Sequence, residues 1–161
     1  MRPKYGAAVV SLDELGGLCA AARSRNLTII QCHGCFDFLH YGHLLHFSEA
    51  AALGDILVVT VTADDHVRKG AGRPLYGQDV RASFVAALQP VDYVAISPYP
   101  TASEAIGVIQ PELFVKGGDY HEDDPRLAQE RAAVERAGGE LRCLSAPAYS
   151  STDLIQRLGD R

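Results

Sequence analysis

Short apolar runs alternate with amphipathic segments along most of the chain. Apolar runs of strand length occur at residues 27–32, 55–63, 91–97, 112–117 and 140–146. Segments with helical spacing of apolar residues occur at 11–25, 42–54, 77–89, 101–109, 125–139 and 150–158. Continuous apolar runs are typical of strands buried on both faces, and the intervening helical segments favour parallel connections between those strands.

This alternation predicts one α/β domain over residues 1–161. We expect a doubly wound, Rossmann-like parallel sheet with helices on both faces. Capping boxes at Ser11 with Glu14 and at Thr101 with Glu104 mark two helix starts, and Gly54 marks a helix end. Ligands in such folds bind beyond the carboxyl ends of the strands, so we expect the functional site there.

The overall charge limits the classes of partner. The 161 residues carry a formal net charge of −5 at pH 7, which argues against nucleic acid as a partner. No apolar run approaches the roughly 18 residues that a membrane-spanning helix needs. We therefore expect a cytoplasmic protein with no membrane partner, whose four cysteines are mostly reduced thiols.

Residues 31–43, QCHGCFDFLHYGH, concentrate the reactive side chains. Cys32 and Cys35 form a C-x-x-C pair at a strand-to-helix junction, so a redox motif is one interpretation. Combined with His40 and His43, the cysteines give a second interpretation, a compact zinc site. The third interpretation, which we favour for the cysteines, is that they are small buried hydrophobic residues.

The two histidines indicate a different chemistry. His40 and His43 stand just before an apolar helix, and Gly42 between them lets a ligand approach the backbone. Helix N-termini bind phosphate because they present unpaired N–H groups and the positive end of the helix dipole. Histidines at this position can donate hydrogen bonds to developing negative charge. The stretch therefore predicts a site that handles phosphate.

Four segments of the chain resemble one family. GCFDFLHYGH is similar to the G-x-F-D-x-x-H-x-G-H signature of the cytidylyltransferase-like nucleotidyltransferases. GRPLYGQDVRASFVAALQPVDYVAI, PELFVKGGDY and YSSTDLIQRL resemble later parts of the nucleotidyltransferase domain of ADP-heptose synthase. The last segment also resembles the closing helix of glycerol-3-phosphate cytidylyltransferase. These segments follow the family's order over nearly the whole chain.

The resemblance implies roles for the matching residues. His40 and His43 would contact the triphosphate and stabilise the transition state. Lys69, or another basic residue of the 68–73 loop, and Arg81 would bind phosphate and act with the histidines in catalysis. The other implied nucleotide-binding residues are Gly34, Cys35, Phe36, Gly42, Lys116, Gly117, Asp119, Ser150, Ser151 and Thr152.

The implied reaction is transfer of AMP or CMP from ATP or CTP to a phosphorylated sugar similar to heptose 1-phosphate, with release of pyrophosphate. Mg²⁺ is the expected cofactor, held mainly by the substrate phosphates. The alternative is a cytidylyltransferase acting on a polyol or alcohol phosphate or on a phosphonate. The resemblance also implies a homodimer.

Two departures and one rival function bear on this interpretation. His33 stands where family members often carry asparagine. Residues 145–148, SAPA, replace the basic and acidic residues found before the closing helix of glycerol-3-phosphate cytidylyltransferase, which argues against glycerol 3-phosphate as the acceptor. The rival is a protein that binds nucleotide without catalysis, and the intact His40 and His43 argue against it.

Overall fold

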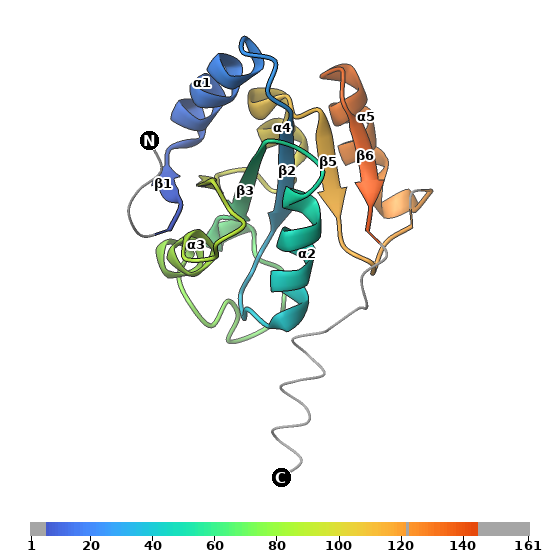
Figure 1. Ribbon diagram of the computed structural model, residues 1–161. Coiled ribbons are helices and arrows are strands. Elements are labelled where there is room, and N and C mark those ends of the chain that lie inside the picture. The colour runs from blue at the N-terminus through green and yellow to red at the C-terminus, as the bar shows by residue number, and fades with distance from the viewer. Residues whose placement is uncertain (1–5, 122, 145–161) are drawn as a thin grey trace.

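The computed structural model describes residues 6–121 and 123–144, which fold into a parallel sheet flanked by helices (Figure 1). The six strands lie in the order β1-β4-β3-β2-β5-β6, and all neighbouring pairs are parallel. The strands are β1 (Ala8–Val10), β2 (Ile29–Gly34), β3 (Ile56–Thr62), β4 (Tyr93–Ser97), β5 (Leu113–Lys116) and β6 (Glu140–Cys143). The doubly wound α/β fold predicted from the sequence is confirmed.

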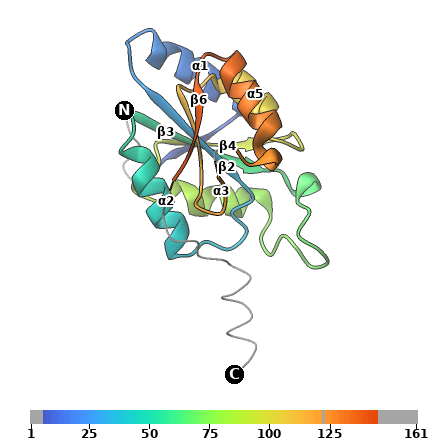
Figure 2. The ribbon, with the colours of Figure 1, turned by 90° about the vertical axis from the view of Figure 1, so that its right-hand side faces the viewer.

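Helices cover both faces of this sheet (Figure 2). One face carries α1 (Leu12–Arg23), α4 (Ser103–Ile109) and α5 (Ala128–Arg136), and the other carries α2 (Tyr41–Ala51) and α3 (Gln78–Ala86). Short 3-10 turns follow β3 and precede α5, at η1 (Asp64–His66) and η2 (Pro125–Leu127). Within the described ranges, no helix is long and apolar enough to cross a membrane.

The central strands are apolar throughout because both of their faces are buried. In β2, Ile30 packs with side chains of α2 and α3, whereas Ile29 packs with side chains of α1 and α4. In β3, Val59 belongs to the first of these clusters and Val58 to the second. Successive side chains of a strand point to opposite faces, so a sheet covered on both sides needs apolar residues at every position.

One of the two predicted capping boxes is confirmed. The Glu14 N–H donates to Ser11 Oγ at 3.2 Å, and the Ser11 N–H donates to the Glu14 carboxylate at 3.0 Å. The second prediction was wrong, because Ala102 directly precedes α4 and has no capping side chain. Thr101 Oγ1 instead accepts the Ser103 N–H at 3.3 Å, one residue too early for a capping box.

The strand order creates a switch point between β2 and β5. From β2 the chain moves to one side through β3 and β4, and then returns to place β5 on the other side of β2. The connection after β2 leads to α2 on one face, and the connection after β5 leads to α5 on the opposite face. The crevice between such diverging connections is where doubly wound folds bind ligands.

Candidate functional site

A cavity of about 500 Å³ lies at the carboxyl ends of β2 and β5. All sequence-predicted site residues within the described ranges line it, except Arg81. Ser150, Ser151 and Thr152 lie outside the described residues. The lining comprises His33, Gly34, Cys35, Phe36, His40, Gly42, His43, His46, Lys69, Pro100, Thr101, Ala102, Val115, Lys116, Gly117, Gly118, Asp119, Tyr120, Arg126, Gln129 and Glu130.

His40 and His43 cap the N-terminus of α2 reciprocally. Nδ1 of His40 accepts the Gly42 N–H at 3.1 Å, and Nδ1 of His43 accepts the His40 N–H at 3.3 Å. Because each Nδ1 is an acceptor, a neutral ring carries its proton on Nε2 and keeps that N–H as a donor. The pair therefore supplies two hydrogen-bond donors at the positive end of the helix dipole.

Burial favours the neutral form of both rings. Together with weaker repulsion from neighbouring basic groups such as Lys69, burial lowers the pKa of His43 to about 3. Burial also lowers the pKa of His40, although Asp119 opposes this shift. An imidazolium has no acceptor nitrogen, so the neutral state is also the state that preserves the two caps.

Thermal stability should fall as the pH drops below about 6.5. Burial lowers the pKa of His33 to about 3, of His43 to about 3 and of His46 to about 4, from an ordinary value of 6.5. Below pH 6.5 the unfolded chain therefore binds more protons than the folded chain. The stabilisation is fully present above pH 6.5 and is lost progressively as the pH approaches the folded values. Calorimetric melting temperatures across this range test the prediction. His46→Phe, with one such group fewer, should show a shallower dependence, and a flat profile in the unmodified chain would contradict it.

The loop after β2 fixes the orientation of His43. A side chain at Gly34 would place its Cβ 2.9 Å from the Phe36 ring, so only glycine fits. Phe36 has a left-handed backbone conformation (φ 49°) and packs edge-on against His43, with 5.6 Å between ring centroids. The ring is 8% exposed and also contacts Phe47. These contacts indicate that Phe36 holds the ring of His43 in its orientation by packing against it.

Asp37 joins the loop after β2 to the loop after β3. Its buried carboxylate pairs with Arg73 and accepts the Leu75 N–H at 2.5 Å. Burial raises the pKa of Asp37, but Arg73 and the N–H donors outweigh it and hold the pKa below its ordinary value. The geometry thus favours a bracing role for Asp37, and its ion pair commits Arg73 to the same role.

The structure does not bring Arg81 into the cavity, contrary to the contact with phosphate expected from the sequence. Its side chain is fully buried. Its guanidinium N–H groups donate to Thr62 O at 2.7 Å, Asp64 Oδ1 at 2.7 Å, Tyr76 O at 3.0 Å and the Cys35 carbonyl and sulfur. A guanidinium engaged in this way has no donor left for a substrate. Arg81 instead connects the end of β3 with the loop after β2 and with the segment between β3 and α3.

Lys69 is the basic residue of the 68–73 loop that lines the cavity. It is exposed, and its charge lowers the pKa of both His40 and His43, which places its ammonium group near the pair. In the part of the chain that the structure describes, Lys69 forms no ion pair. Arg68 donates to the Asp65 carbonyl at 2.8 Å. Lys69 is therefore the available cation beside the histidines.

The end of β5 supplies the opposite wall. Nζ of Lys116 pairs with Glu130 at 3.1 Å, and the two side chains are only 11% and 14% exposed. The ammonium group also lies 4.8 Å from the centroid of the Tyr120 ring. Asp119 and the side-chain-free Gly117 complete this wall. Glu130 and Tyr120 thus compensate much of the charge of Lys116.

Sequence reasoning missed several lining residues. His46 had a usable signal, because it continues the three-residue spacing of His40 and His43 along α2. No sequence pattern distinguishes the lining residues Arg126, Gln129 and Glu130. They belong to a charged segment, and such a segment is typical of any solvated helix surface. Their position at the cavity follows only from the crossover that returns β5 to the side of β2.

The cysteines do not form a metal or redox centre in this geometry. Cys32 is fully buried on β2 within an apolar cluster, and burial raises its pKa far above the ordinary value. Burial also raises the pKa of Cys35, whereas a reactive thiol needs a lowered pKa. No group of three or more metal-ligating side chains is arranged to hold an ion within residues 6–121 and 123–144. The zinc interpretation was therefore wrong.

Replacing Cys32 and Cys35 together with alanine should leave most activity intact. Both thiols are free, and the part of Cys35 that Arg81 holds most closely is its carbonyl, which alanine retains. Loss of the buried Cys32 sulfur should cost roughly 1 kcal/mol of folding free energy. Turnover of the double variant, normalised to its folded fraction, measures the effect. Complete loss of turnover in a folded double variant would revive a role for the thiols.

The cytidylyltransferase-like family model matches residues 31–157 of the chain, which include the cavity-lining histidines. The bifunctional protein HldE of Photobacterium profundum is 41% identical over 152 residues, covering 93% of this chain and 31% of that protein. HldE of Geotalea uraniireducens is 36% identical over 159 residues, covering 97% and 32%. The chain thus spans about a third of the length of these relatives.

Two solved structures share the fold. The lipopolysaccharide core biosynthesis protein from Thermoplasma volcanium GSS1 superposes with a TM-score of 0.63 at 23% identity, covering 77% of this chain and 99% of that chain. Pantoate-beta-alanine ligase from Francisella tularensis, solved with beta-gamma ATP and beta-alanine, superposes with a TM-score of 0.64 at 10% identity, covering 92% and 76%. At these identities the superpositions support the architecture alone.

Proposed function

Because the chain belongs to the cytidylyltransferase-like family, we propose that it is a nucleotidyltransferase. It moves a nucleoside monophosphate from ATP or CTP to a phosphorylated sugar and releases pyrophosphate. The observation that carries this proposal is the reciprocally capped pair of His40 and His43 at the N-terminus of α2, with Lys69 in the same cavity. Donors and a cation at a helix N-terminus match the charge of a transferring phosphoryl group.

The reaction depends on positioning and charge stabilisation rather than on a covalent enzyme intermediate. An oxygen of the acceptor phosphate bonds to the α-phosphorus, and the bond from that phosphorus to the bridging oxygen of pyrophosphate breaks. The electron pair of the broken bond leaves with pyrophosphate. The Nε2–H groups of His40 and His43 donate to phosphate oxygens as this charge builds up, and Lys69 neutralises part of it.

We further propose that Mg²⁺ enters with the substrate phosphates, whose charge it neutralises. Two carboxylates line the cavity, and one of them, Glu130, is paired with Lys116. Among the described lining residues, that leaves Asp119 as the carboxylate available to the ion. One or two carboxylates with phosphate and water oxygens fit Mg²⁺, which seldom has a dedicated protein cage.

For the substrates, we propose ATP as donor and a sugar similar to heptose 1-phosphate as acceptor. The support is the motif resemblance to the nucleotidyltransferase domain of ADP-heptose synthase and the similarity to HldE proteins over nearly the whole chain. The alternative is a cytidylyltransferase acting on a polyol or alcohol phosphate or a phosphonate, which is equally compatible with the family match. A cavity of about 500 Å³ is of the size that small-molecule sites have.

Pyrophosphate release tests the proposal. ATP and CTP are each offered with Mg²⁺ and a panel of sugar 1-phosphates, polyol phosphates and phosphonates. Release that needs one nucleotide and one acceptor, and that stops with a chelator, supports the transferase and its metal. Nucleotide binding without release for any pair contradicts it and favours the non-catalytic rival.

The homodimer implied by the resemblance and the cytoplasmic location expected from the apolar pattern of the sequence stay predictions. Light scattering coupled to size-exclusion chromatography gives the molar mass in solution, and cell fractionation gives the location. A mass near the 17.3 kDa of one chain would contradict the dimer.

A further inference from the structure

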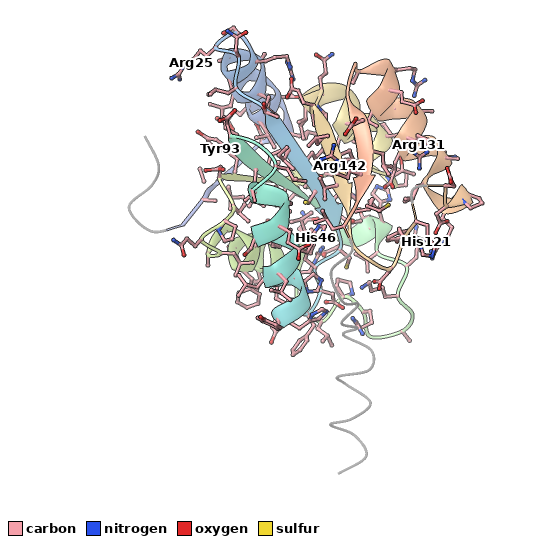
Figure 3. The ribbon with its side chains drawn as sticks, turned by 45° about the vertical axis from the view of Figure 1, so that its right-hand side comes forward. Arg25, His46, Tyr93, His121, Arg131 and Arg142 are labelled. Atoms are coloured by element: carbon pink, nitrogen blue, oxygen red, sulfur yellow. The ribbon has the colours of Figure 1, made fainter. Side chains whose placement is uncertain are left out.

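The wall of the cavity opposite the histidine pair includes the starts of α4 and α5. Ala102 and Leu127, which directly precede these helices, belong to one apolar cluster, so the two helix starts pack together. The histidine pair stands on α2, which covers the other face of the sheet. Figure 3 shows the two helices on either side of the central strands, with His46 labelled on α2 and Arg131 on α5. Donor phosphates bound at α2 therefore leave this wall to another part of the substrates.

The cations of this wall are paired, in contrast to Lys69 beside the histidines. Lys116 pairs with Glu130 at 3.1 Å, and Arg126 pairs with Asp124 at 2.6 Å. A phosphate gains little from a cation that is already paired, and the carboxylate of Glu130 would repel it. The wall therefore suits an uncharged polar group better than a phosphate.

Two neighbouring residues at the start of α5 offer hydrogen bonds to such a group. Gln129 is exposed and lines the cavity, and its amide supplies both a donor and an acceptor. The carboxylate of Glu130 also lines the cavity and has about four acceptor sites, more than the pair with Lys116 uses. Closely spaced donors and acceptors of this kind match the hydroxyl groups of a sugar.

The ion pair of Glu130 with Lys116 is better explained by binding than by stability. Both side chains are mostly buried, so both groups give up water to form the pair, and the net gain in stability is small. A hydrogen bond from a hydroxyl group to a charged carboxylate is stronger than one to a neutral acceptor. The pair holds this carboxylate in place at the cavity.

We infer that Gln129 and Glu130 are specificity-determining residues for the acceptor, whose sugar hydroxyl groups they bind. Glu130 accepts a hydrogen bond from one hydroxyl group, and the amide of Gln129 bonds to another. The phosphate of the acceptor extends from this wall toward the histidine pair and Lys69. This inference rests on the proposed function, since the acceptor must be a phosphorylated sugar.

NMR titration of the full chain tests the inference without turnover. The probes are heptose 1-phosphate and the 1-phosphates of glucose, galactose and mannose, and inorganic phosphate is the reference without a sugar. Each titration is run with and without α,β-methylene ATP and Mg²⁺, because this analogue occupies the donor site but does not release pyrophosphate. The unmodified chain should bind at least one sugar 1-phosphate more tightly than inorganic phosphate.

Glu130→Gln keeps the shape of the side chain and an acceptor for Lys116 but removes the carboxylate. The preference for the best sugar 1-phosphate over inorganic phosphate should fall about 10-fold. Affinity for α,β-methylene ATP should not fall, because the charge freed on Lys116 attracts phosphate. A deoxy analogue that lacks the hydroxyl group bound by Glu130 should show little further loss in this variant. Glu135→Gln is the matched control, since Glu135 is an exposed residue of α5 that does not line the cavity.

Gln129→Ala provides a second variant that does not depend on the folding of Glu130→Gln. The residue is exposed on α5, so the free protein tolerates the change. The preference for the sugar 1-phosphate should fall about threefold, as expected for loss of a hydrogen bond between neutral groups. In the turnover assay both variants should raise the KM of the acceptor far more than the KM of the nucleotide.

Three outcomes would overturn the assignment. These are an unchanged preference in the folded variants, a loss confined to α,β-methylene ATP, or an unmodified chain that binds no sugar 1-phosphate more tightly than inorganic phosphate. The second outcome would give the wall to the donor. If the sugar 1-phosphate binds and the variants weaken it, but no pyrophosphate is released, the proposed reaction fails while the assignment of the wall stands.

Discussion

Replacing His43 with alanine should lower turnover about 100-fold or more while the chain still folds. The substitution removes the Nε2–H donor at the point where negative charge develops on the phosphate. It also removes the acceptor of the His40 N–H, a bond of 3.3 Å, so the first turn of α2 loses part of its cap. The effect should appear in kcat more than in nucleotide affinity, because the donor matters most in the transition state.

Two further variants separate the chemistry of His43 from its packing. His43→Gln keeps an N–H donor on a side chain of similar reach and should retain more turnover than His43→Ala. Leu44→Ala changes the next residue of the same helix, which is 39% exposed and does not line the cavity, and should turn over normally. Near-normal turnover in folded His43→Ala would exclude the assigned role.

Replacing Arg81 with methionine should lower the free energy of unfolding by about 3 kcal/mol or more. Methionine fills much of the same volume, so the loss would come from hydrogen bonds rather than from an empty cavity. The carbonyls of Cys35 and Thr62 would each lose the Arg81 donor, and Asp64 would lose its ion-pair partner. Urea unfolding measures the change through the midpoint at constant slope.

Arg142→Ala is the matched control for this experiment. Arg142 pairs with Glu140 on the surface, with side chains 42% and 59% exposed, and its loss should change stability by no more than about 1 kcal/mol. An Arg81→Met variant as stable as the parent but unable to bind nucleotide would contradict the bracing role. That result would restore the contact with phosphate predicted from the sequence.

The part of the site that sequence reasoning located correctly is the part carried by local pattern. His40, Gly42 and His43 stand within four residues at a strand-to-helix junction, so their placement at a helix N-terminus follows from the chain itself. Lys116 and Gly117 likewise end a clear apolar strand, and parallel strands place their carboxyl ends at one edge. Local spacing and one rule of sheet geometry suffice for these residues.

Arg81 shows where such reasoning stops. In sequence it is a basic residue of an apolar helix, and that pattern fits both a ligand of phosphate and an internal brace. The choice depends on whether carbonyl groups from Cys35 and Thr62 converge on it, and these come from two other segments of the chain. No local signal reports this convergence, and the same holds for the pairing of Asp37 with Arg73.

The strand β1 was missed for a different reason. Its three residues, Ala8–Val10, are too few to show a period, and they form a strand by pairing with Tyr93–Ala95 of β4. The start of α4 was misplaced because the Thr101 hydroxyl bonds to the Glu104 carboxylate rather than capping the helix. A tertiary pairing thus decided the conformation of residues 8–10, whereas a local side-chain hydrogen bond between residues three apart decided the start of α4.

The described edges of the sheet have a consequence for self-association. β1 has three residues and β6 has four, so each offers a short row of main-chain groups to an added strand. Short edges are poor templates for strand addition, and copies of this chain should therefore resist joining into a continuous sheet. A homodimer, if it forms, would then be held by side chains on helices and loops, where Leu75, Tyr76, Val80 and Phe84 are each at least 43% exposed.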